Sequence, residues 1–191
     1  MSVTSSIVRV ATLSVAGLVL AACASGTVVA TRDYNNPIYT PHWFAYAASG
    51  RDLAVIVRGN PTAAPQADFA SAVTAAMNAH QTGPKTNFTI SPSDNARKDF
   101  RVVMLFGDTV NEYAACDDPH GVTLAPASGG ARLNAVFCYG QRPMTAIQIS
   151  ANGLGGPGGP TLGDMVSAAM LRLFPAIDFI RDGQPDNNFR A

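Results

Sequence analysis

Charged residues are scarce in this chain of 191 residues. They make up 14% of the sequence, and 13 Lys and Arg balance 13 Asp and Glu, so the formal net charge is zero. Proteins that bind nucleic acids neutralise phosphates with a basic excess or a basic stripe. The composition therefore argues against a nucleic-acid partner. Because 47% of the residues are hydrophobic, it also argues against a chain that is disordered throughout.

Residue types that carry catalysis or bind metals are also few. Glu112 is the only glutamate, which excludes glycosidase chemistry by a pair of glutamates, and the sequence has no G-x-S-x-G nucleophile elbow. The three histidines lie far apart and no C-x-x-C spacing occurs, so we expect no metal site. We also expect no cofactor. The sequence favours a domain without catalysis of its own and leaves an enzyme open.

The N-terminal part lacks a hydrophobic run long enough to span a membrane. Its start carries one positive charge, Arg9, and no acid, and an uncharged run follows over residues 10–20. At a rise of about 1.5 Å per residue, this run covers roughly half of the hydrocarbon core of a bilayer. A positive start, a short apolar run and small residues after it predict a secretory signal peptide over residues 1–22.

The apolar run ends in LAAC at residues 20–23, which matches the lipobox at each position. The N-terminus therefore resembles that of bacterial lipoprotein precursors. The resemblance implies that the peptide before Cys23 is removed, that the Cys23 sulfur is diacylated, and that the new N-terminus is often acylated too, as by palmitate. At about 0.8 kcal/mol per buried CH₂, two or three acyl chains anchor a protein permanently. The alternative is an ordinary secretory cleavage beside a chance cysteine.

The residues after the expected anchor bear on its location. Ala24 and Ser25 follow Cys23. In lipoproteins of the best-known Gram-negative bacteria, an Asp after the lipidated cysteine favours the inner membrane, so this resemblance favours the outer membrane. We expect a cell-envelope protein that contacts the membrane through its N-terminal lipid and faces the periplasm, with the inner membrane as the alternative.

Two cysteines remain besides Cys23. Export to an oxidising compartment favours a disulfide between Cys116 and Cys138. A bond closing that segment contributes roughly 3 kcal/mol in the chain-entropy treatment. The alternative is two buried free thiols.

Residues 23–50 contain few aliphatic side chains and no periodic pattern. They hold five of the fifteen aromatic residues of the chain: Tyr34, Tyr39, Trp43, Phe44 and Tyr46. Proline and asparagine interrupt regular structure here. We expect a tether, continuing from the lipid anchor, whose aromatic residues lie across the domain surface. The alternative is a segment that recognises a partner or a glycan.

The hydrophobic pattern of residues 51–175 predicts one α+β domain. We expect strands over residues 53–57, 87–91, 100–106, 133–139 and 145–150, and helices over 65–80 and 161–174. Because no helix separates the four later strands, we expect a mostly antiparallel sheet of about five strands with both helices on one face. This is a two-layer sandwich in the order βαββββα. Residues 176–191 are expected to form a polar C-terminal tail, and the sequence shows no repeat.

Two loops contain residues with chemical potential. Residues 152–160, NGLGGPGGP, include the spacing G-x-G-x-x-G, but neither a following strand nor a lysine completes a nucleotide site. We expect this segment to be a mobile connector that binds no nucleotide. Asp117, Asp118 and His120 place carboxylates beside a histidine, as acid–base chemistry or a metal requires. We expect a solvated turn held by Cys116.

Residues 52–106, with DLAVIVRGNP and RVVMLF, resemble uncharacterised proteobacterial lipoproteins, and this resemblance implies no activity. The favoured function is a lipid-anchored, non-enzymatic binding or structural module whose partner is an envelope protein or the cell wall. One alternative is a membrane-anchored periplasmic hydrolase that uses Asp117, Asp118 or His120. A small-ligand carrier, the other alternative, requires an apolar cavity between sheet and helices.

Overall fold

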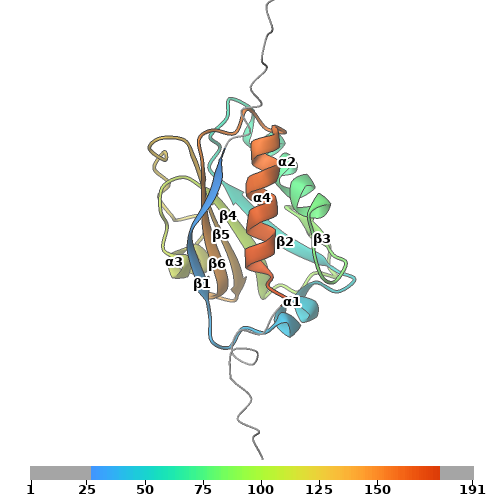
Figure 1. The fold of residues 1–191 in the computed structure, drawn as a ribbon. Helices are drawn as coiled ribbons and strands as arrows, with labels where there is room; N and C mark the ends of the chain where they lie inside the picture. The colour runs from blue at the N-terminus through green and yellow to red at the C-terminus, as the bar shows by residue number, and fades with distance from the viewer. Residues whose placement is uncertain (1–26, 177–191) are drawn as a thin grey trace, which may run out of the picture.

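The computed structural model describes residues 27–176, so the expected signal peptide, Cys23 and nearly all of the expected tail lie outside the described residues. The described residues form one sheet with helices on both faces (Figure 1). The elements are β1 (Val28–Asn35), α1 (Pro41–Ala48), β2 (Asp52–Arg58), α2 (Gln66–Ala79), β3 (Asn87–Thr89), β4 (Phe100–Phe106), α3 (Glu112–Asp117), β5 (Ala131–Tyr139), β6 (Arg142–Ala151) and α4 (Pro160–Leu173). Within residues 27–176, no helix is long and apolar enough to cross a bilayer.

The sheet has six strands in the order β1-β6-β5-β4-β2-β3. Neighbours from β1 to β4 are antiparallel, whereas β2 is parallel to both β4 and β3. The α+β class is confirmed, but the expected sheet of about five mostly antiparallel strands is corrected to a mixed sheet of six. Helix α2 and the loop over residues 90–99 each return the chain to the same end of the sheet, which makes β2, β3 and β4 parallel.

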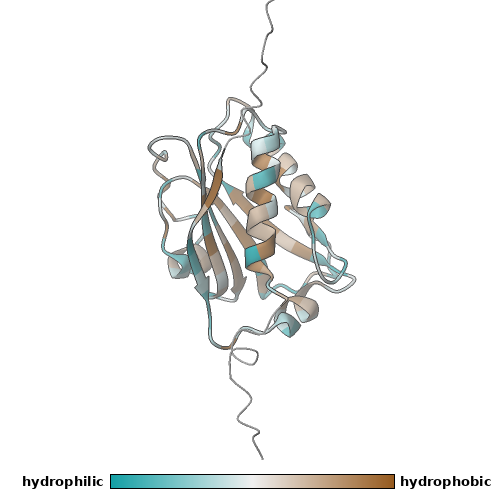
Figure 2. Cartoon of the chain, in the orientation of Figure 1, coloured by the Kyte–Doolittle hydropathy of each residue, from teal (hydrophilic) through white to brown (hydrophobic). Residues whose placement is uncertain are grey.

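The larger core lies between the sheet and the helices α2 and α4, which cover one face (Figure 1). On α4 the buried side chains recur at spacings of three and four residues, as expected for one apolar stripe. Figure 2 shows hydrophobic residues along the central strands behind α4 and hydrophilic residues on its outward side. The helices expected over residues 65–80 and 161–174 correspond to α2 and α4.

Residues 28–48 belong to the domain and do not form the expected tether. Strand β1 pairs with β6 along its whole length, and α1 packs against the core. The ring centres of Phe44 and Phe174 lie 3.8 Å apart, and Phe44 and Tyr39 are both buried. Trp43 donates a hydrogen bond from Nε1 to the Ile38 carbonyl oxygen at 2.8 Å. Tyr39 and Phe44 therefore belong to the core and Trp43 packs against it, whereas Tyr46 stays exposed.

The second face of the sheet is covered by α3, which lies between the strands expected over residues 100–106 and 133–139, where no helix was expected. Its contact with the sheet is a small apolar cluster: Val103, Leu105, Ala115, Cys116, Val136 and Cys138. The domain thus has two helices more than expected, α1 against the main core and α3 on the opposite face.

Candidate functional site

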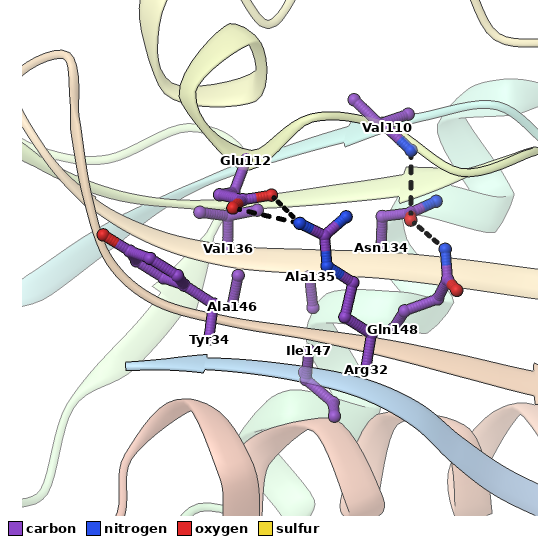
Figure 3. A pocket seen from close by; sticks show the side chains of 10 residues that line it. All are labelled: Arg32, Tyr34, Val110, Glu112, Asn134, Ala135, Val136, Ala146, Ile147 and Gln148. Carbon is purple, nitrogen blue, oxygen red and sulfur yellow. Dashed lines mark hydrogen bonds and ion pairs between the residues drawn. The ribbon is translucent and has the colours of Figure 1, made fainter. Parts of the chain in front are cut away.

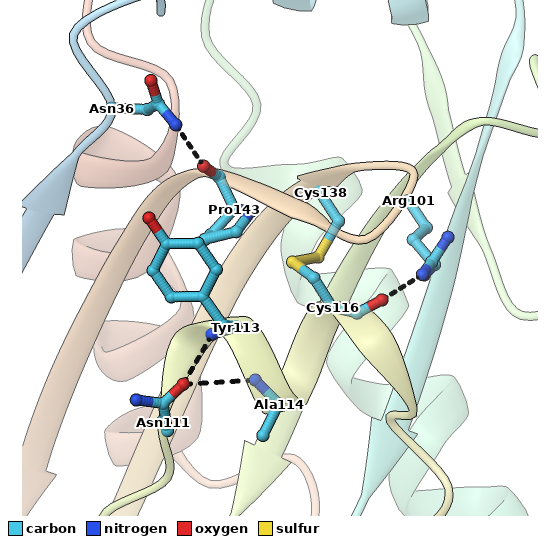
Figure 4. The surroundings of a disulfide bond; sticks show 8 residues. All are labelled: Asn36, Arg101, Asn111, Tyr113, Ala114, Cys116, Cys138 and Pro143. Carbon is cyan, nitrogen blue, oxygen red and sulfur yellow. Dashed lines mark hydrogen bonds between the residues drawn. A yellow bond between two sulfur atoms is a disulfide. The ribbon is translucent and has the colours of Figure 1, made fainter.

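The two cysteines of the domain join α3 to the sheet (Figure 4). Cys116 of α3 and Cys138 of β5 form a disulfide with their Cα atoms 5.7 Å apart, and both residues are fully buried. The guanidinium of Arg101 donates a hydrogen bond to the Cys116 carbonyl oxygen. Asn111 caps the helix, since its Oδ1 accepts from the backbone N–H groups of Tyr113 at 2.9 Å and Ala114 at 3.2 Å. The expected pairing of these cysteines is present, and it holds α3 in place.

The acidic loop after Cys116 forms a turn that is closed by its own backbone. Asp117, Asp118 and His120 are exposed. The Asp118 carboxylate accepts a hydrogen bond from the backbone N–H of His120 at 3.1 Å. A Cβ on Gly121 would lie only 2.1 Å from Asp118 Oδ2, so the carboxylate folds over the turn. Within the described residues, no three His, Cys, Asp or Glu side chains gather to hold a metal ion.

The glycine-rich connector joins β6 to α4. Four of its glycines, Gly153, Gly155, Gly156 and Gly158, have positive φ. The strand that precedes it, β6, is antiparallel to both of its neighbours. A dinucleotide site uses a parallel strand–loop–helix–strand unit. The G-x-G-x-x-G spacing therefore stands here in a different structural context.

A polar cluster lies on the second face, between β1, β5, β6 and the start of α3 (Figure 3). Asn134 is buried at its centre and donates from Nδ2 to the Asp108 carbonyl oxygen at 3.0 Å. Its Oδ1 accepts from Gln148 Nε2 at 2.9 Å and from the Val110 backbone N–H at 3.4 Å. Gln148 in turn accepts from the Thr31 hydroxyl at 3.0 Å. These contacts tie the loop before α3 to β5 and β6.

The same cluster contains the only glutamate of the chain. Glu112 is 8% exposed, and Arg32 of β1 lies against it with 3.2 Å between Nη2 and Oε2. The hydroxyl groups of Tyr34 and Tyr113 are 2.9 Å apart. Partial burial, together with the hydrogen bond to Tyr113, raises the pKa of Tyr34 to about 12. The cavity between these side chains has a volume of about 20 Å³, which is room for about one water molecule. The cluster therefore fixes α3 and encloses no space for an organic substrate.

A second group of side chains gathers at the end of the sheet where β5 turns into β6. We call it the distal surface and define it by Tyr46, Arg97, Tyr113, Tyr139 and Arg142. Two open hollows of about 370 Å³ and about 400 Å³ meet at Tyr139, which lines both. The sequence indicated only Tyr46 as a recognition candidate. The other four residues lie on three separate segments, and no local pattern in the sequence connects them.

Comparisons of this chain with protein-family models, with curated proteins and with solved structures find no match.

Proposed function

We propose that this chain is a lipid-anchored protein of the bacterial cell envelope, and that its domain is a non-enzymatic binding or structural module facing the periplasm. The observation that carries the proposal is the LAAC sequence at residues 20–23, directly after a short apolar run. The buried disulfide between Cys116 and Cys138 supports it, because such bonds persist in oxidising compartments outside the cytoplasm.

The place where the domain begins supports a defined orientation on the membrane. Four residues separate Cys23 from Val28, and a chain of this length spans at most about 18 Å between the two Cα atoms. Val28 pairs with Ala151 at the end of β6, at the upper end of the molecule in Figure 1. The loops over residues 59–65, 122–130 and 152–159 lie at this end and contain no charged residue. In this orientation, these uncharged loops face the lipid headgroups, together with Asp108 and Arg132, which form an ion pair with each other at the same end.

The geometry of the acidic loop favours a binding module over the hydrolase alternative. The Asp118 carboxylate is engaged with the backbone of its own turn, and the side chain of His120 is exposed to solvent. The open, tyrosine-lined distal surface instead offers area for contact with a large partner.

Lipidation is tested by expressing the full chain in a Gram-negative bacterium with a labelled fatty acid. The protein is expected to incorporate label and to partition into detergent, whereas Cys23→Ala does neither. As a control of sorting, Ala24→Asp is expected to keep the label and to move the protein from the outer to the inner membrane. Equal labelling and partitioning of Cys23→Ala would overturn the anchor.

The module is tested by replacing Asp117, Asp118 and His120 with Ala together, in parallel with Arg142→Glu on the distal surface. If the domain acts by binding, an envelope phenotype of a deletion strain is rescued by the loop variant and not by the surface variant. Rescue by the surface variant alone would favour the hydrolase.

A further inference from the structure

The distal surface lies at the end of the domain that points away from the expected anchor. Strands β2 and β4 begin there, and the turn between β5 and β6 is there, at the lower end of Figure 1. Strand β6 has ten residues, which at about 3.3 Å per residue places this end roughly 33 Å from the end where β1 begins. An anchored domain therefore presents the distal surface to components of the periplasm rather than to its own membrane.

The aromatic side chains of the distal surface are exposed and held rigidly. Tyr46 is 56% exposed, Tyr113 50% and Tyr139 38%. The Arg97 guanidinium lies 3.6 Å from the centre of the Tyr46 ring and donates to the Tyr46 backbone carbonyl and hydroxyl oxygens, both at 2.9 Å. The Tyr139 ring packs on Phe100 and on Trp43, with 4.9 Å and 5.1 Å between the ring centres. Because these rings are fixed before any ligand arrives, binding loses little side-chain entropy.

Positive side chains surround these rings. Arg51, Arg97 and Lys98 line one hollow and Arg142 lines the other, with Asp94 and Asp99 beside the first. Within residues 27–176, none of the four cations forms an ion pair. Arg142 is exposed at the start of β6, and no aspartate lines the hollow that it shares with Tyr113 and Tyr139. A guanidinium in this position is suited to a carboxylate of a ligand.

We propose that the distal surface binds the glycan of the bacterial cell wall, a polymer of N-acetylated amino sugars that carries carboxylates. This inference rests on the proposed envelope location. The C–H groups on the face of a sugar ring are attracted to the negative face of an aromatic ring, here the exposed parts of the Tyr113 and Tyr139 rings. Amide and hydroxyl groups of the sugars hydrogen-bond to Gln141 and to the Tyr139 hydroxyl, and a carboxylate pairs with Arg142. Because the two hollows are open and adjoin at Tyr139, an extended chain can pass across both of them. An enclosed small-molecule cavity would not admit such a chain.

The test is sedimentation of the full-length protein, solubilised in detergent, with purified insoluble peptidoglycan. We expect saturable binding that soluble fragments of the same glycan displace. Tyr139→Ala and Arg142→Glu should each weaken the apparent affinity at least tenfold. Because Tyr139 also packs on Phe100, the exposed Arg142 provides the variant that leaves the fold intact. Arg172→Ala removes a positive charge from the exposed side of α4, together with its ion pair to Asp33, and serves as the control for a general effect of charge; it should bind like the unchanged protein.

Three outcomes would overturn the proposal. They are unchanged binding by Arg142→Glu, equal weakening by Arg172→Ala, and no sedimentation with peptidoglycan at all. If no glycan binds and a second protein is cross-linked at Tyr139, the surface belongs to a protein partner instead. Since sedimentation in detergent does not depend on the lipid, a failure here with normal labelling of Cys23 rejects the glycan and leaves the anchor standing.

Discussion

Reduction of the Cys116–Cys138 disulfide is expected to lower the free energy of unfolding by about 3 kcal/mol. The two cysteines are 22 residues apart in the sequence. For a loop of this length, the chain-entropy relation gives about 11 cal/mol/K, or about 3.4 kcal/mol at 25 °C. Both cysteines are fully buried, so reduction also leaves two thiols in the tightly packed cluster beneath α3. The bond therefore contributes a large share of the 5–15 kcal/mol that is typical of domains.

The loss should be concentrated in α3. This helix has six residues, and isolated helices of that length are unstable in water. In the folded protein it is held by the disulfide, by the Asn111 cap and by the contact between Glu112 and Arg32. Once the disulfide is reduced, hydrogen exchange of the backbone amides over residues 112–117 should accelerate before that of β4 or β5.

Urea unfolding of the oxidised protein, the reduced protein and the double variant Cys116→Ala/Cys138→Ala measures this effect. The reduced protein and the double variant should each unfold at lower urea concentration than the oxidised protein. Reductant should not move the transition of the double variant, which serves as the control. A difference below about 1 kcal/mol between oxidised and reduced protein would refute the assigned role of the bond.

Three further predictions follow from single positions. Phe44→Ala should lower the free energy of unfolding by about 3–5 kcal/mol in urea titrations, because this ring is 3% exposed, whereas a residue of a surface tether would show almost no effect. Gly59→Ala should lower the free energy of unfolding by more than about 2 kcal/mol, because φ is +73° and the new Cβ would lie 1.9 Å from a backbone oxygen. Gly155→Ala should lower it by only about 1 kcal/mol, because φ is +68° but the new Cβ would meet open space. Partial burial and the hydrogen bond to Tyr113 raise the pKa of Tyr34 to about 12. The folded protein therefore keeps a proton that the unfolded chain loses near pH 10, and the contribution of this group to stability falls between pH 10 and pH 12. An NMR titration should show this pKa, and Tyr113→Phe should lower it.

The elements with strong periodic patterns could be predicted from the sequence. The strand expected over residues 100–106 is β4 at the same bounds, and the helix expected over 65–80 is α2 within one residue at each end. A short apolar run such as VVMLF, with two β-branched residues, is typical of a strand that is buried on both faces, and β4 is buried at all but one position. For such segments the local pattern and the tertiary contacts favour the same structure, which is why the sequence predicts them.

Strand β1 could not be predicted in this way, because contacts with distant residues stabilise it. It is an edge strand with mostly exposed residues, and its centre carries the adjacent charges Arg32 and Asp33. Arg32 pairs with Glu112 of α3 on one face, and Asp33 pairs with Arg172 of α4 at 3.1 Å on the other. Charged residues are ordinary on edge strands, where they oppose pairing with other chains. Without the positions of α3 and α4, the same residues resemble a polar linker.

The aromatic residues near the N-terminus show why composition alone could not identify the candidate site. Phe44 points into the core and Tyr46, two residues later on the same short helix, lies on the distal surface. Their roles depend on α1 standing at the edge of the core, which only the folded chain shows. Arg97 and Arg142 reach the same surface from segments about 50 and 100 residues away from Tyr46 in the sequence.

Strand β5 connects the disulfide with the distal surface. Side chains alternate along a strand, so Phe137 and Tyr139 point to one face and Cys138 to the other. Phe137 is buried beneath the helices. Tyr139, two residues later, is partly exposed and packs on Phe100. Cys138 fastens the same end of the strand to α3, and α3 supplies Tyr113 to the hollow that Tyr139 lines. The disulfide therefore holds two of the three surface tyrosines in fixed relation to each other. Under the proposed function, the bond therefore positions binding residues in addition to stabilising the fold.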